Sequence, residues 1–123
     1  MAMKRTRLAK RSKRKIKTWA EYDKLMGEYA IQHCAVCASL GQYDVGRVCG
    51  HHILTKGAYP QYRMEPLNII PLCQSHHTWS SLIAPHSMRH AAVRAWWEWL
   101  KKNSPVQWRW VVKASGRNPL ESR

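Results

Sequence analysis

At 123 residues the chain has room for one domain with a modest hydrophobic core, which commonly needs a second stabiliser such as a structural metal. It carries 21 Lys and Arg against 7 Asp and Glu, a formal net charge of +14, and this excess favours a polyanionic partner such as nucleic acid. No apolar run approaches the roughly 18 residues of a membrane span, and no secretory signal follows the first Met, so we expect a cytoplasmic protein with no membrane partner.

Residues 1–17 hold nine of the basic side chains and no acidic one. We expect a disordered basic arm here, because so charged a segment cannot bury enough apolar surface to fold. A solvating tail or a ribosome- or membrane-surface anchor would have the same composition. The cations nearest the folded part are candidate contacts to nucleic-acid phosphates: Lys13, Arg14, Lys15 and Lys17.

The folded domain is expected over residues 18–113. Thr18 and Glu21 have capping-box spacing, and Trp19, Tyr22, Met26 and Tyr29 follow at helical intervals. The expected elements in chain order are a helix over 18–31, a Cys knuckle, a strand over 47–54, a polar loop over 55–67, a strand over 68–72 and a helical segment over 73–82.

The C-terminal part is expected to be helical. Ser87 is a reasonable N-cap for a helix over 88–102, whose apolar stripe comprises Met88, Ala92, Ala95, Trp96, Trp99 and Leu100. Residues 105–113 alternate as a strand would, yet Ser104-Pro105 is typical of a helix start, and we favour the helix. Residues 114–123 are expected to be a flexible tail.

A structural metal site is predicted from two short-spaced pairs. Cys34-x-x-Cys37 places two thiolates on one tight turn, and Cys73-x-x-His76 supplies a second pair from the start of a helix. Three thiolates and one imidazole form an ordinary structural zinc set. Cys49 remains an alternative ligand in place of Cys73 or His76, although a small buried apolar role suits it better.

Three further histidines and one asparagine predict a second centre. His51 and His52 are adjacent, Asn68 follows in the next strand, and His77 lies in the next helix. Hydrolysis of a phosphodiester needs an activated water, a cation on the phosphate and help for the leaving 3′-oxygen. One histidine can act as the base, an Asn can orient it by a hydrogen bond, and other histidines can bind the cation.

Residues 34–82 resemble the HNH nuclease family, also known as the ββα-metal or His-Me finger family. The resemblance includes both short-spaced pairs, Cys34-x-x-Cys37 and Cys73-x-x-His76. It extends to the run Leu72-Cys73-x-x-His76-His77, where many members have Leu-Cys-x-x-Cys-His. It implies an α+β fold, with a small ββα-metal core and a structural zinc site flanked by N- and C-terminal helices. The chain's size, basic arm and Trp-rich C-terminal helix are similar to those of small phage and prophage members.

The resemblance also assigns roles to single residues. It implies that His52 is the general base, that Asn68 orients it, and that His51 and His77 bind the catalytic ion. Ser81 stands where some members have a third metal-binding histidine. In the loop between the strands, Lys56 and Arg63 are candidates for binding the phosphate, although a solvated surface role is an equal alternative.

The activity that the resemblance implies is that of a metal-dependent DNA endonuclease, nicking or cutting DNA with low sequence specificity. Its cofactors would be a structural Zn²⁺ and a catalytic Mg²⁺, Mn²⁺, Ni²⁺ or Zn²⁺. DNA is the expected partner, with other phage, recombination or packaging proteins by analogy, in a bacterial or phage-infected cell; monomer and homodimer stay open. One alternative is a zinc-stabilised DNA-binding module without catalysis, and a remoter one is a thiol redox protein using Cys34 and Cys37.

Overall fold

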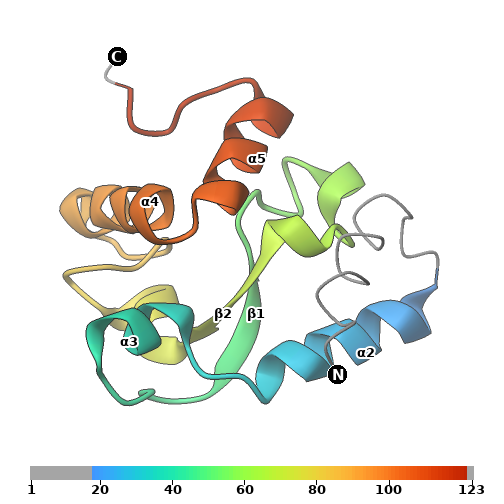
Figure 1. Ribbon diagram of the computed structural model, residues 1–123, viewed down its shortest axis with the longest axis horizontal. Coiled ribbons are helices and arrows are strands. Elements are labelled where there is room, and N and C mark those ends of the chain that lie inside the picture. The colour runs from blue at the N-terminus through green and yellow to red at the C-terminus, as the bar shows by residue number, and fades with distance from the viewer. Residues whose placement is uncertain (1–17, 122–123) are drawn as a thin grey trace.

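The computed structural model describes residues 18–121, a mixed α+β domain with helices on both faces of a two-stranded sheet (Figure 1). The predicted basic arm over residues 1–17 lies outside the described residues. The elements are α2 (Trp19–Ala30), α3 (Ala35–Leu40), β1 (Val48–His52), the 3₁₀ turns η1 (Pro60–Tyr62) and η2 (Pro66–Asn68), β2 (Ile69–Cys73), the π-helical turn η3 (Ser75–Trp79), α4 (His90–Asn103) and α5 (Pro105–Ser115).

The sheet is an antiparallel pair in which His51 lies opposite Ile70 and His52 lies opposite Ile69. Successive side chains of a strand point to opposite faces. The His51 ring accordingly contacts Trp96 of α4, with centroids 5.7 Å apart, whereas the His52 ring stacks on Tyr22 of α2 at 6.1 Å. The last two residues of β1 therefore serve two different sides of the molecule.

Helix α2 forms as its capping signal predicts, since the Thr18 hydroxyl accepts a hydrogen bond from the Glu21 N–H at 3.1 Å. It packs directly on the sheet through a small cluster of Leu25, Tyr29 and Ile69. Gly50 permits this approach, because a Cβ there would lie 2.9 Å from the Met26 methyl carbon. One face of the sheet is thereby covered by α2.

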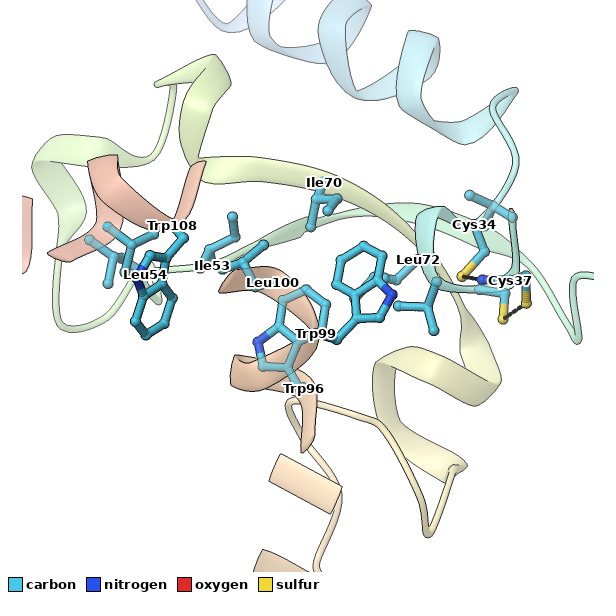
Figure 2. Packing of buried hydrophobic residues seen from close by; sticks show 14 residues of the cluster. Cys34, Cys37, Ile53, Leu54, Ile70, Leu72, Trp96, Trp99, Leu100 and Trp108 are labelled. Carbon is cyan, nitrogen blue, oxygen red and sulfur yellow. Dashed lines mark hydrogen bonds between the residues drawn. The ribbon is translucent and has the colours of Figure 1, made fainter. Parts of the chain in front are cut away.

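The main core lies on the other face of the sheet. Trp96 and Leu100 are fully buried and Trp99 nearly so, which confirms the predicted stripe of α4 at these positions. Figure 2 shows these side chains between the paired cysteines at one end of the cluster and Trp108 of α5 at the other. The core therefore joins the cysteine-bearing elements to both C-terminal helices.

Several predicted boundaries move. Helix α4 begins at His90, because the Ser87 hydroxyl accepts from the Arg89 N–H in a turn before it; Met88, predicted to be in the buried stripe, is 98% exposed. The segment from Pro105 is helical, as favoured, and runs to Ser115, past the predicted limit at 113. Leu120 also packs against the core, so the described part of the predicted tail is not detached.

The predicted helical segment over 73–82 is reduced to the single π turn η3, after which Ser80 is extended. A π turn is wider than an α turn and is common where a functional side chain must be redirected. Across residues 18–121, no helix has the length and apolar character needed to cross a membrane.

Candidate metal centres and catalytic site

Four side chains of the predicted zinc set meet in a buried cluster: Cys34, Cys37, Cys73 and His76. The sulfur atoms of Cys37 and Cys73 are 3.7 Å apart, and the Nδ1 atom of His76 lies 3.2 to 3.7 Å from the three sulfurs. A tetrahedral zinc ion with bonds near 2.3 Å to sulfur and 2.0 Å to nitrogen requires ligand separations of about 3.5 to 3.8 Å. These residues can therefore bind a metal ion such as zinc.

Local backbone features hold the cluster together. Cys34 is the N-cap of α3, and its sulfur accepts from the Cys37 N–H at 3.5 Å. Asp44 accepts from the Cys34 N–H at 3.0 Å and fixes the following loop. Gly46 has a φ of +84°, and a Cβ there would lie 2.8 Å from Gln74 beside Cys73. The sequence between the two pairs thus folds so that the pairs face each other.

Two side chains near the cluster are not part of it. Cys49 is half-buried in β1 opposite Leu72 and belongs to neither metal-type cluster found among residues 18–121. His33 is 90% exposed, and its Nδ1 atom lies 3.1 Å from an oxygen of Asp44. The donor set is therefore the predicted one, without Cys49.

Burial raises the pKa of the Cys34 and Cys37 thiols above the ordinary value. Burial acts in the same direction on Cys73, but hydrogen bonds from the backbone N–H groups of His76 and Val45 and from the Cys37 and Cys34 thiols together outweigh it, and the pKa of Cys73 is lowered. Burial lowers the pKa of His76 despite the nearby Asp44. A neutral imidazole and an ionisable thiol are both suited to bind a cation.

A second cluster consists of His51, His77 and His86, whose ligand atoms all lie within 4.8 Å of one another. The three ring centroids form a nearly equilateral triangle with sides of 4.9, 5.0 and 4.9 Å. The expected pair of His51 and His77 is thus brought together, and a third histidine joins it. Three imidazoles around one point are a common nitrogen donor set for a divalent transition metal.

The chemistry of the donor set fits a cation. The Nε2 atom of His51 is buried and has no hydrogen-bond partner among the described residues. Burial, followed by the neighbouring rings of His77 and His86, holds the pKa of His51 well below its ordinary value. The pKa of His77 is lowered by burial and by His86. All of these shifts favour neutral rings with lone pairs available for a metal.

His86 is the functional candidate that the sequence did not reveal. It is exposed, lies in the loop between η3 and α4, and reaches the cluster because its backbone N–H donates to the His77 carbonyl at 3.2 Å. Ser81, the position compared with a third histidine, is outside the cluster. The only sequence signal is a histidine next to Pro85, nine residues beyond His77. The loop that carries it has no periodic pattern from which its fold back toward His77 could be predicted.

His52 lies on the other side of β1 from this cluster. Its Nε2 atom donates to the Arg63 carbonyl at 2.8 Å, and within residues 18–121 no hydrogen bond engages its Nδ1 atom. Burial lowers the pKa of His52, the hydrogen bond to Arg63 opposes this, and the charges of Lys56 and Arg63 lower it further. A neutral ring protonated on Nε2 has its basic lone pair on Nδ1.

Asn68 does not make the predicted hydrogen bond to His52. Its fully buried amide accepts from the Leu54 N–H at 2.6 Å and donates to the carbonyls of Leu54 at 3.0 Å and Tyr62 at 3.1 Å. The reason is that Asn68 ends η2, directly before β2, where its side chain faces the backbone that leaves β1. Its influence on His52 is indirect, because it fixes the loop that carries the Arg63 carbonyl.

The predicted phosphate-binding side chains are divided between described and undescribed residues. Lys56 is exposed, and Arg63 is half-buried with its guanidinium 5.3 Å from the centroid of the Trp19 ring. Both charges lie close enough to lower the pKa of His52. The four candidates in the arm lie outside the described residues: Lys13, Arg14, Lys15 and Lys17.

No family model, curated protein or solved structure matches this chain.

Proposed function

We propose that the protein is a metal-dependent endonuclease that hydrolyses phosphodiester bonds in DNA, with His52 as the general base. The observation that carries the proposal is the arrangement at the end of β1. There a neutral His52, whose Nδ1 atom has no hydrogen-bond partner among residues 18–121, directly follows His51, which belongs to a cluster of three histidines. The resemblance of residues 34–82 to the HNH family, and with it the ββα-metal fold, is part of the same proposal.

The proposed role of His52 is proton transfer. Its Nε2–H is held by the Arg63 carbonyl, so the ring presents Nδ1 to a water molecule and removes its proton as the water attacks phosphorus. Because the pKa of His52 is lowered, the ring stays neutral and able to act as a base at neutral pH.

The proposed ligands of the catalytic ion are His51, His77 and His86. A divalent ion held there would supply positive charge for the scissile phosphate and for the leaving 3′-oxygen. A donor set of three imidazoles without a carboxylate favours Zn²⁺ or Ni²⁺ over Mg²⁺ and Mn²⁺, which prefer oxygen ligands. We propose that the Cys34, Cys37, Cys73 and His76 cluster holds a structural zinc ion.

DNA is the proposed substrate because the chain carries a formal net charge of +14. Of its cationic side chains, Lys56 and Arg63 lie close to His52. The phosphodiester is proposed to lie over the end of β1, between the His52 ring on one face and the three-histidine cluster on the other. Non-specific phosphate contacts of this kind give affinity with little sequence preference.

A plasmid-nicking assay tests the proposal. The zinc-loaded protein is incubated with supercoiled DNA and Mg²⁺, Mn²⁺, Ni²⁺ or Zn²⁺, with EDTA as the blank. The wild type should nick the plasmid, His52→Ala should lose activity by at least about a hundredfold while it still binds DNA, and His90→Ala, at an exposed position of α4, should behave as wild type.

Substantial activity in the His52→Ala variant would contradict the assignment of the base. A wild type that binds DNA tightly but cleaves it with none of the metals would favour the alternative, a zinc-stabilised DNA-binding module without catalysis.

A further inference from the structure

We infer that Tyr22 of α2 is a positioning residue that fixes the ring orientation of His52 and reinforces the tautomer that the Arg63 carbonyl favours. This inference rests on the proposed function, in which His52 is the base. It makes the N-terminal helix part of the catalytic site, although α2 lies outside the segment that carries the histidines.

The contact between the two side chains has two components. The Tyr22 hydroxyl oxygen lies 3.2 Å from the Nε2 atom of His52. The two rings are also stacked, with centroids 6.1 Å apart and an interplanar angle of 27°. Stacking restrains the plane of the imidazole, while the hydroxyl restrains its rotation within that plane.

The direction of the hydrogen bonds follows from the acceptor. The Arg63 carbonyl can only accept, so the His52 Nε2 atom at 2.8 Å must carry the proton. The Tyr22 oxygen then accepts the longer, weaker half of a bifurcated hydrogen bond from the same N–H. Two acceptors on Nε2 stabilise the tautomer whose basic lone pair is on Nδ1, the tautomer that a base attacking water through Nδ1 requires.

Trp19 and Arg63 also contact the Tyr22–His52 pair, so that the four residues form a ring of contacts. The Trp19 ring meets the Tyr22 ring edge-on at 5.6 Å with an interplanar angle of 89°. The Arg63 guanidinium lies 5.3 Å from the Trp19 centroid, and the Arg63 carbonyl binds His52. These contacts hold helix α2 against the loop between the strands, with the His52 imidazole between them.

Burial raises the pKa of Tyr22, so its hydroxyl keeps its proton at neutral pH. Since its oxygen accepts from His52 and no other hydrogen bond engages it among the described residues, the hydroxyl hydrogen can orient toward solvent. The interaction is therefore that of a neutral phenol. A phenylalanine would keep the stacked ring and remove only the hydroxyl.

The test compares Tyr22→Phe with Tyr29→Phe. Tyr29 lies two turns further along the same helix, where its hydroxyl donates to the Pro66 carbonyl at 3.4 Å, so the control removes a hydroxyl without touching His52. We expect Tyr22→Phe to lower kcat for plasmid nicking about tenfold with KM and DNA affinity unchanged, as for other residues that orient a functional imidazole. Tyr29→Phe should keep the wild-type kcat.

A second measurement does not depend on activity. The nitrogen-15 shifts of His52, recorded on the zinc-loaded protein where its ring is neutral, report which ring nitrogen carries the proton. The wild type should be the pure Nε2–H tautomer, and Tyr22→Phe should populate the Nδ1–H form measurably. An unchanged kcat and an unchanged tautomer in Tyr22→Phe would overturn the inference, as would an equal loss of kcat in Tyr29→Phe.

The two proposals fail in different ways. A wild type that cleaves with no metal refutes the nuclease, and the nitrogen-15 shifts still decide whether Tyr22 reinforces the Nε2–H tautomer of His52. A wild type that cleaves, with a Tyr22→Phe variant that matches it in both measurements, refutes only the positioning role.

Discussion

His76 and His77 are neighbours in the π turn η3, yet their rings belong to different clusters. The Nδ1 atom of His76 lies 3.2 Å from the Cys37 sulfur, and the His77 ring lies 4.9 Å from the His51 ring. A single peptide unit therefore joins the cysteine cluster to the three-histidine cluster. A change in the position of His76 must change the position of His77.

Loss of the cysteine cluster is therefore expected to disable both centres. Cys34→Ser removes one of four ligands, and because metal-binding energy is folding energy in such small sites, the domain should unfold or melt far below the wild type. Cys49→Ser is the matched control, since Cys49 lies in neither cluster. Elemental analysis for zinc and a thermal melt by circular dichroism measure both effects. A stable, zinc-free Cys34→Ser variant would refute the structural site.

Zinc binding should release protons. Burial raises the pKa of Cys34 and Cys37, so both thiols are protonated in the metal-free protein at neutral pH and must ionise when zinc binds. The apparent affinity should therefore rise with pH through the neutral range. Calorimetric titrations in buffers of different ionisation enthalpy count the protons, with Cys49→Ser expected to match the wild type. An affinity that does not vary with pH would contradict this assignment.

His86 should contribute to the affinity of the three-histidine cluster for its ion. His86→Ala leaves two imidazoles in place of three, and we expect metal affinity at this site to fall by roughly one to two orders of magnitude while the zinc content of the cysteine cluster stays the same. His90→Ala removes an exposed histidine of α4 and serves as control. Competition with a metal indicator measures the affinities. Equal binding by the His86→Ala variant would limit the site to His51 and His77.

Replacing Asn68 should mainly lower the stability of the domain. Asn68→Ala removes three hydrogen bonds, two of them buried, and leaves both backbone groups of Leu54 without partners among the described residues, so the free energy of unfolding should fall by about 2 to 4 kcal/mol. Asn103→Ala removes a single bond, from its amide to the Trp99 carbonyl at the exposed end of α4, and should cost less than about 1 kcal/mol. Urea unfolding compares the two. Similar losses of stability in both variants would contradict the structural role of the Asn68 hydrogen bonds.

The features that the sequence predicts best are those formed by residues only a few positions apart in the chain. The capping pair Thr18 and Glu21 marks the start of α2, and each metal-binding pair of the cysteine cluster lies within one turn of chain. His86 could not be predicted, because its place depends on a loop that folds back to His77 without any periodic signal. The partner of Asn68 was predicted wrongly for a related reason, since a side-chain amide can satisfy any nearby backbone group, and spacing does not say which.

The contact between Tyr22 and His52 shows the same limit across 30 residues. Helical spacing correctly predicts that Tyr22 belongs to α2, but it does not say which strand residue the helix will meet. That depends on the close approach at Gly50, where Met26 fills the space that a side chain would occupy. Tertiary packing, rather than any local pattern, decides which residues surround the proposed base.

The basic arm is expected to supply much of the affinity for DNA, because residues 1–17 carry nine of the 21 Lys and Arg side chains. Deleting it should weaken DNA binding and flatten the dependence of affinity on salt, since the slope of log K against log salt falls by about 0.9 for each phosphate that is no longer neutralised. An arm of equal length with its Lys and Arg replaced by Gln should behave as the deletion does, which separates charge from chain length. The catalytic rate at saturating DNA should change little, because the three-histidine cluster and His52 lie within the described residues. Fluorescence anisotropy over a series of salt concentrations measures the slope, and a slope equal to that of the full chain would exclude the arm as the DNA anchor.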